Sequence, residues 1–214
     1  TSKTEITTAK DGTVTESKSE TRTGADGTKS VTKAESKTDK NGATSGTETT
    51  TTTAPNGSTG TTVTTTENGS SRTEAETKLS SKAVEEAKRN GEPVKAPVEV
   101  EAGKDSNSAP TVKIELPKSA GDTKVEIPVT NVKPGTVAVL VHPDGTEEII
   151  KDSIPTGNGV QLTVSGGATV KILDNSKDFG DIQSHWAKDA IDFVSARGLV
   201  NGINPTLYSP NASA

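Results

Sequence analysis

Two histidines and one acidic loop are the residues of this 214-residue chain whose types could support metal chemistry. His142 and His185 lie 43 positions apart, and neither has a second histidine or a pair of carboxylates at ligand spacing. Residues 174–178, Asp-Asn-Ser-Lys-Asp, place oxygen donors as a calcium loop does, but Phe179 stands where that loop requires glycine. The sequence therefore predicts no metal site.

The motifs of catalysis are equally absent from the sequence. The chain has no cysteine, which excludes thiolate nucleophiles and disulfides. It contains no G-x-S-x-G, no glycine-rich phosphate loop and no H-E-x-x-H. Its acidic residues alternate with lysine and threonine, as on solvent-exposed faces. We therefore expect no enzyme and no cofactor.

Composition limits both the fold and the partners. With 28% hydrophobic and 2% aromatic residues, the chain is too poor in core-forming side chains to be one compact domain. A net charge of −5, with 24 basic and 29 acidic residues interspersed, offers no basic surface for nucleic acid. No apolar run is long enough to span a membrane, and the opening Thr-Ser-Lys is not a signal peptide. We expect an internal piece of a longer protein.

Residues 1–78 form a threonine-rich repeat punctuated by Asp-Gly or Asn-Gly pairs. The pairs begin at positions 11, 26, 41, 56 and 68, so the period is 15 and then 12. Such pairs favour type I′ hairpin turns, and the threonine-rich segments between them suit strands. However, four large aliphatic side chains supply only about 8 kcal/mol on burial, against about 100 kcal/mol for ordering the backbone. A single-layer β-meander and a disordered stalk both remain open, and the tract 49–53 is the least able to fix a register.

The middle of the chain predicts a helix followed by a small β-domain. Ser80 and Ser81 precede good helix formers, and Asn90-Gly91 ends them. Residues 92–101 indicate an extended strand and residues 102–110 a linker. Six short apolar strands with glycine-containing turns follow within 111–173, which is typical of a small antiparallel sandwich or barrel.

These segments together predict a mainly β fold with four parts. They are a Thr/Ser/Gly-rich stalk at 1–78, a helix, strand and linker at 79–110, a β-domain at 111–173, and a helical segment at 174–214. In the last part, Ser184 is a plausible N-cap, and a wide apolar face from Trp186 to Val194 precedes Gly198. This helix needs a partner to bury that face against, so we expect it to fray or to borrow one.

All four aromatic side chains fall in the last 36 residues, where 179–210 read F-G-D-I-Q-S-H-W-A-K-D-A-I and end L-V-N-G-I-N-P-T-L-Y-S-P. This segment resembles the opening of an S-layer homology module, with the pattern F-x-D, H-W-A, a loop glycine and an aromatic-x-P. The resemblance implies an extracellular protein of the cell wall or S-layer in a Gram-positive bacterium. It further implies non-covalent binding to secondary cell-wall polysaccharide.

The resemblance also assigns candidate binding residues. Asp181, Trp186 and Gly202 match positions that the family uses for the polysaccharide or its groove. The arginine of the family's Thr-Arg-Ala motif has no counterpart here, so binding is expected to need sequence beyond this chain. Taken as residues alone, Asp181 is as plausibly a structural brace, and Trp186 as plausibly a core side chain.

Two functions from different classes follow. The first is a non-enzymatic surface-protein fragment, in which the stalk and the β-domain lead to a wall anchor. The alternative is an adhesin or extracellular matrix protein whose repeats or β-domain bind a host or cell-surface partner. An exposed aliphatic patch or an unpaired strand edge within 111–173 favours that alternative.

Overall fold

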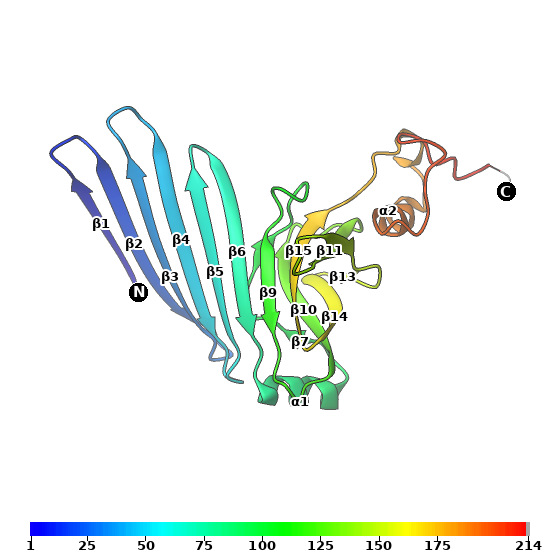
Figure 1. Cartoon of the computed structure of the whole chain (residues 1–214), viewed down its shortest axis with the longest axis horizontal. Coiled ribbons are helices and arrows are strands. Elements are labelled where there is room, and N and C mark those ends of the chain that lie inside the picture. Colours follow the sequence, from blue (N-terminus) through cyan, green and yellow to red (C-terminus); the bar gives the residue numbers. More distant parts are fainter. Residues whose placement is uncertain (213–214) are drawn as a thin grey trace.

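The structure is a computed structural model that describes residues 1–212, so the last two residues of the predicted 174–214 segment lie outside the described residues. It is mainly β, as predicted, and consists of a long-stranded meander, a β-sandwich and a small C-terminal lobe (Figure 1). One sheet has ten strands in the order β1-β2-β3-β4-β5-β6-β9-β15-β11-β12. A second sheet has the order β13-β14-β10-β7, with β8 also pairing with β10.

Six consecutive antiparallel strands form the meander, which confirms the ordered alternative for the threonine-rich repeat. Neighbouring strands keep one continuous register, and the tract 49–53 is paired on both sides. The strands are β1 (Ser2–Thr8), β2 (Val14–Thr23), β3 (Lys29–Thr38), β4 (Thr44–Thr53), β5 (Thr59–Glu67) and β6 (Ser70–Lys78).

The turns between these strands differ from the prediction at four of five positions. Only Asn68-Gly69 has positive φ at both residues, 47° and 86°, as a type I′ turn requires. At the other four pairs only the glycine has positive φ, and a bond such as Gly12 N–H to the Ala9 carbonyl closes a three-residue loop. The Asp11 carboxylate accepts the Thr13 N–H at 2.9 Å, and this bond stabilises a backbone conformation of Asp11 outside the left-handed region.

Hydroxyl pairs and backbone ladders, rather than a core, order the meander. Ile6 is 64% exposed and Val14 is also exposed, so the expected aliphatic burial is wrong for both. On one face, cross-strand hydroxyls bond at 2.9 Å between Thr32 and Thr50 and again between Thr64 and Thr73. The same face becomes apolar toward β6, where Ala75 enters the main core.

The predicted helix is α1 (Ser81–Asn90). The Ser80 hydroxyl accepts the Ala83 N–H at 3.1 Å, and Gly91 ends the helix with φ of 71°. Ala83 and Val84 are buried, so the helix closes one end of the sandwich. The extended segment that follows forms two short strands, β7 (Val94–Lys95) and β8 (Val100–Glu101), which both pair parallel with β10.

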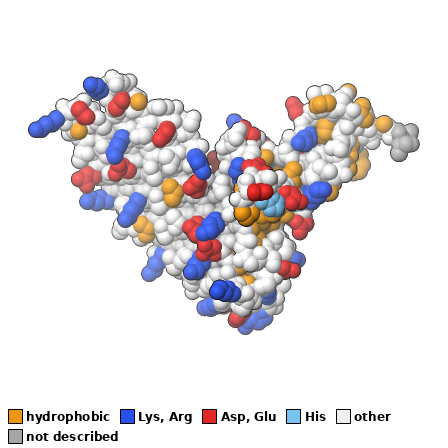
Figure 2. Space-filling model, in the orientation of Figure 1, with side chains coloured by type: hydrophobic (Ala, Val, Ile, Leu, Met, Phe, Trp, Pro, Cys, Tyr) orange, Lys and Arg blue, Asp and Glu red, His pale blue; other side chains and the backbone are white. Residues whose placement is uncertain are grey.

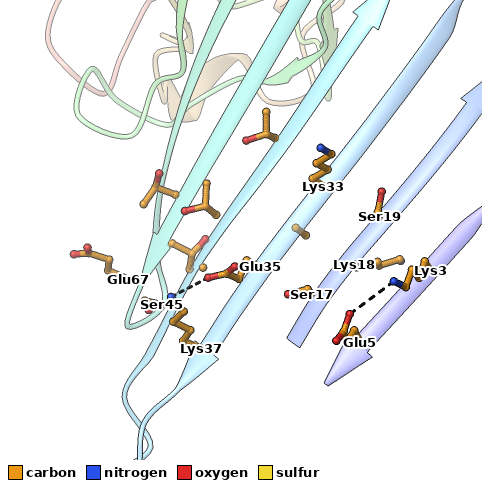
Figure 3. A pocket seen from close by; sticks show the side chains of 16 residues that line it. Lys3, Glu5, Ser17, Lys18, Ser19, Lys33, Glu35, Lys37, Ser45 and Glu67 are labelled. Carbon is orange, nitrogen blue, oxygen red and sulfur yellow. Dashed lines mark ion pairs between the residues drawn. The ribbon is translucent and has the colours of Figure 1, made fainter. Parts of the chain in front are cut away.

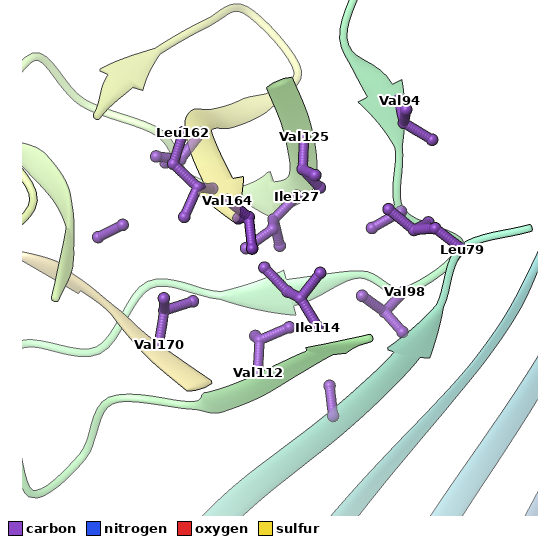
Figure 4. Close-up of a cluster of buried hydrophobic side chains, with 14 of the residues drawn as sticks. Leu79, Val94, Val98, Val112, Ile114, Val125, Ile127, Leu162, Val164 and Val170 are labelled. Atoms are coloured by element: carbon purple, nitrogen blue, oxygen red, sulfur yellow. The ribbon is translucent and has the colours of Figure 1, made fainter. Parts of the chain in front are cut away.

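The six strands predicted within 111–173 all form, and they pack as a sandwich. They are β9 (Thr111–Glu115), β10 (Asp122–Thr130), β11 (Thr136–Val141), β12 (Glu147–Ile149), β14 (Gly159–Ser165) and β15 (Gly167–Asp174), with β13 (Ile154–Pro155) in addition. Aliphatic side chains from the two sheets meet between the layers (Figure 4). The fully buried ones include Leu79, Val112, Ile114, Val125, Ile127, Val164 and Val170.

The meander and the sandwich share one sheet. Strand β6 pairs parallel with β9, from Glu74 opposite Thr111 to Lys78 opposite Glu115. At the same end, Gly60 of β5 lies directly beneath the Pro97 carbonyl, leaving no room for a Cβ atom. The sequence alone does not predict this junction, because the two strands lie more than thirty residues apart. Among the described residues, no helix is long and apolar enough to cross a membrane.

Candidate functional site

The C-terminal lobe, residues 175–212, carries the candidate residues. It contains the 3-10 turn η1 (Gly180–Ile182) and the helix α2 (Lys188–Ala196). The prediction that Ser184 caps this helix is wrong, because the helix begins after Ala187, which makes no side-chain cap. Residues 183–187 form turns instead, in which His185 Nδ1 accepts the Ala187 N–H at 3.2 Å.

Asp181 braces the loop that follows α2. Its carboxylate accepts the Tyr208 N–H at 2.9 Å and the Ser209 N–H at 2.6 Å. The Tyr208 amide is the largest influence that lowers the pKa of Asp181, and the His185 imidazole adds a smaller one. Asp181 is therefore an ionised acceptor whose two oxygens are both engaged by backbone.

Gly202 permits the close folding of the same loop. A Cβ atom added there would lie 2.5 Å from the Leu207 carbonyl oxygen and 2.5 Å from the Phe179 ring. Phe179 is buried, and its ring lies 5.6 Å from that of Tyr208. Asp181 and Gly202 thus shape one loop, and they do so from positions more than twenty residues apart.

Trp186 lies on the surface. It is 91% exposed, so the alternative that it is a core side chain is wrong. Its nearest aromatic neighbour is His185, with ring centroids 5.5 Å apart. A tryptophan that buries almost none of its area adds nothing to the folded core, and it leaves a broad aromatic face free for a ligand.

Helix α2 borrows the β-sandwich as its partner. Ala196 is fully buried in a cluster with Val137, Val139 and Leu173 of the sandwich. Arg197, which follows the helix, is 1% exposed. Its guanidinium donates to the carbonyls of Ser153, Thr136, Phe193 and Pro134 at 2.7 to 3.3 Å.

Arg197 is a buried cation that is held by backbone carbonyls and has no carboxylate among its hydrogen-bond partners. Burial lowers its pKa from the usual arginine value to about 10, which leaves it charged at neutral pH. Its guanidinium carbon also lies 3.8 Å from the centre of the Phe193 ring. The sequence analysis did not single out Arg197, since an arginine after a helix usually indicates an exposed end. Only the position of the neighbouring strands shows its role.

Lys188, two residues after Trp186 in the chain, is already paired with a carboxylate. Lys188 lies 2.5 Å from the Asp192 carboxylate, which is the main reason that its pKa is raised.

The calcium-like segment 174–178 has its first carboxylate occupied, because Asp174 accepts from Ser176 and pairs with Lys133 at 2.7 Å. His142 lies in the turn between β11 and β12, 3.4 Å from Glu148. Within residues 1–212, no three His, Cys, Asp or Glu side chains gather as metal ligands do.

A shallow hollow of about 660 Å³ lies on the other face of the meander. It is lined by lysine, glutamate, serine and threonine from β1 to β5 (Figure 3). Charges of both signs are interspersed over the meander, whereas apolar side chains gather on the C-terminal lobe (Figure 2). The hollow has no aromatic side chain, and its four lysines and three glutamates nearly balance, so its chemistry selects no ligand.

Comparison with known families agrees with the motif in the C-terminal lobe. Residues 178–214 match the S-layer homology domain. This part of the chain is an S-layer homology segment, and S-layer homology domains bind cell-wall polysaccharide. The segment indicates that the protein is located at the cell wall or S-layer, as predicted.

Two curated relatives match over a short length that includes this region. The chain is 35% identical over 63 residues to Exoglucanase XynX of Acetivibrio thermocellus, covering 27% of the chain and 6% of the relative. It is 36% identical over 63 residues to Endo-1,4-beta-xylanase A of Thermoanaerobacterium saccharolyticum, covering 27% and 5%. The chain therefore spans only a small part of the length of these enzymes. No solved structure matches the chain.

Proposed function

We propose that this chain is a non-enzymatic stalk, spacer and anchor region of a bacterial surface protein, attached non-covalently to secondary cell-wall polysaccharide. The exposure of Trp186, inside a segment of the S-layer homology family, carries the proposal. A side chain of this size is normally at least half buried in a monomer unless it meets a partner. The flat indole suits the apolar face of a sugar ring.

The three candidate residues take different parts in this proposal. Trp186 makes the direct contact with the polysaccharide. Asp181 and Gly202 shape the loop 202–209, because the first holds its backbone amides and the second lets it fold closely. His185 lies between Asp181 and Trp186 along the chain and beside the indole, so it supports the position of that ring.

The meander and the sandwich act as the spacer. Fully extended, residues 1–78 would reach about 240 Å at roughly 3.1 Å per residue. Folded as six paired strands about 4.8 Å apart, they span only about 24 Å from the first strand to the last. The proposed stalk is therefore short and wide, and the division of the chain at residues 78, 110 and 173 is part of the proposal.

The adhesin alternative receives less support. Strand β12 is an edge strand within 111–173, which is one of the features that would favour that alternative. It is only three residues long and carries Glu147 and Glu148, and Glu147 pairs with Lys171 at 2.6 Å. Short, charged edges resist pairing with another chain.

Co-sedimentation of the full-length protein with purified Gram-positive sacculi tests the proposal. We expect the wild type to bind, Trp186→Ala to bind at least tenfold more weakly, and sacculi stripped of polysaccharide to bind neither. Leu199→Ala is the matched control, because Leu199 is also an exposed apolar side chain of the lobe. Equal binding of Trp186→Ala and wild type would remove Trp186 from the site, and failure of the folded wild type to bind would overturn the anchor.

A further inference from the structure

Six asparagines of this chain are followed directly by glycine, and one of these pairs differs from the others in its hydrogen bonds. The pairs begin at Asn41, Asn56, Asn68, Asn90, Asn158 and Asn201. In such a pair the backbone nitrogen of the glycine can attack the side-chain amide carbon of the asparagine, because glycine has no Cβ atom to shield that nitrogen. Each pair is therefore a candidate for spontaneous deamidation.

Hydrogen bonds restrain five of the six pairs. The side-chain oxygen of Asn56 accepts the Ser58 N–H at 3.0 Å, and that of Asn68 accepts the Thr44 N–H at 3.2 Å. In three other pairs the glycine N–H is itself a donor, at 3.0 to 3.3 Å, and these glycines are Gly42, Gly91 and Gly159. In all five pairs a reacting group must leave a partner before the attack, which slows the reaction.

The pair Asn201-Gly202 has neither restraint. Asn201 is exposed, and within residues 1–212 neither its side-chain amide nor the Gly202 N–H makes a hydrogen bond. The segment 200–203 also lies outside every helix and strand, and it makes no backbone hydrogen bond to the rest of the described chain. The two reacting groups are therefore free to approach each other by rotation about the bonds of Asn201.

We propose that Asn201 is a site of spontaneous deamidation in the folded protein. The Gly202 nitrogen forms a bond to Cγ of Asn201 and loses its proton to solvent. The bond from Cγ to Nδ2 breaks, and Nδ2 takes up a proton and leaves as ammonia. Water then opens the resulting cyclic imide at either of its two carbonyl carbons, which yields aspartate or isoaspartate. Water is the only co-reactant, and nothing is oxidised or reduced.

The isoaspartate product changes the main chain where the lobe has no room for it. It adds a methylene group to the backbone immediately before Gly202. A Cβ atom on Gly202 would lie 2.5 Å from both the Leu207 carbonyl oxygen and the Phe179 ring, so this residue has no space to shift into. The added length must then displace the loop 202–209 and weaken the bond from the Tyr208 N–H to Asp181. The aspartate product keeps the original backbone and leaves the loop in place.

Peptide mapping of the folded 214-residue protein by mass spectrometry tests the proposal. The protein is incubated at mildly alkaline pH in water enriched in heavy oxygen, which labels each deamidated residue. Asn201 should react at least about fivefold faster than Asn56 or Asn68, a ratio that corresponds to about 1 kcal/mol for the hydrogen bond that each of those side chains must break. In denaturant the six pairs should react at similar rates, because the folded structure no longer distinguishes them.

Two variants separate the change of charge from the change of backbone. Asn201→Asp adds the carboxylate without lengthening the main chain, so the Tyr208 amide should keep its protection from hydrogen exchange. Asn201→Gln should stay unmodified during the same incubation, because its longer side chain forms the cyclic imide far more slowly, and it should keep that protection. The incubated wild type should lose the protection in proportion to its isoaspartate content.

Two results would overturn the proposal. Equal rates for Asn201 and Asn56 in the folded protein would remove Asn201 as the preferred site. Full protection of the Tyr208 amide in protein that contains isoaspartate at position 201 would remove the effect on the loop. Neither measurement involves cell-wall polysaccharide, so a failure of the proposed anchoring would leave both unchanged.

Discussion

Replacing Arg197 with methionine should release the C-terminal lobe from the β-sandwich. The five hydrogen bonds of its guanidinium contribute about 1.5 kcal/mol each at the lower end for charged donors. Against this, the lowered pKa of about 10 corresponds to a desolvation cost of about 3 kcal/mol. The balance predicts that Arg197→Met destabilises the docked helix α2 by about 4 kcal/mol, since methionine fills the space but leaves four carbonyls without a donor.

Hydrogen exchange of the α2 amides is the direct assay. A loss of about 4 kcal/mol corresponds to roughly a thousandfold faster exchange in α2, whereas the amides of β10 and β14 should change little. Arg22→Met is the control, because Arg22 is exposed and its surface ion pair with Glu20 contributes little.

The pH dependence of this effect follows from the direction of the pKa shift. The folded state holds fewer protons than the unfolded state only from about pH 10 up to the usual pKa of arginine, and the stability of the fold rises with pH in that interval. Below pH 10, Arg197 is charged in both states. The difference between wild type and Arg197→Met should therefore be constant from pH 5 to 9. Unchanged hydrogen exchange in α2 of Arg197→Met would refute the role of Arg197 in docking this helix. A difference between the two proteins that varies with pH from 5 to 9 would refute the conclusion that Arg197 is charged in both states.

Three further outcomes are expected. The pKa of Asp181 is lowered, so its carboxylate stabilises the loop 202–209 fully at a pH above the usual pKa of 3.8, and this stabilisation is lost as the pH falls through the lowered pKa. The Tyr208 amide should therefore lose protection from hydrogen exchange in acid. Asp181→Asn should abolish that pH dependence. Gly202→Ala should destabilise the lobe by about 1–3 kcal/mol through overpacking, measured by exchange of the same amides; unchanged protection would contradict the close approach. Gly60→Ala should lower the melting temperature because its Cβ meets the Pro97 carbonyl, whereas Gly46→Ala in β4 should lower it less; equal effects would argue against that contact.

The Arg197 contacts and the proposed anchoring together suggest how a pulling force would be transmitted through this chain. Arg197 joins α2 to carbonyls of the segment 134–136 and of Ser153, and the sandwich continues into the meander through β6 and β9. A pull on the C-terminal lobe would therefore be carried by buried contacts and by backbone ladders. A flexible linker would instead resist the same pulling force only through the entropy of its chain.

Local sequence patterns determined the type and place of most elements. The alternation of apolar residues from 111 to 173 predicted six strands, and all six form. Ser80 and Gly91 fixed the limits of α1 because capping needs only neighbouring backbone. The S-layer homology motif was equally readable, since it consists of residue types at fixed spacing.

Tertiary contacts decided the rest. Threonine-rich repeats are almost equally compatible with a strand and with a solvated coil. The order of the meander comes from backbone hydrogen-bond ladders and from hydroxyl pairs between strands. The choice between core and surface for Trp186 depended on which face of the lobe meets the sandwich, and the burial of Arg197 depended on carbonyls 44 or more residues away. Sequence patterns report the neighbours of a residue along the chain, whereas burial and charge environment are set by residues distant in sequence.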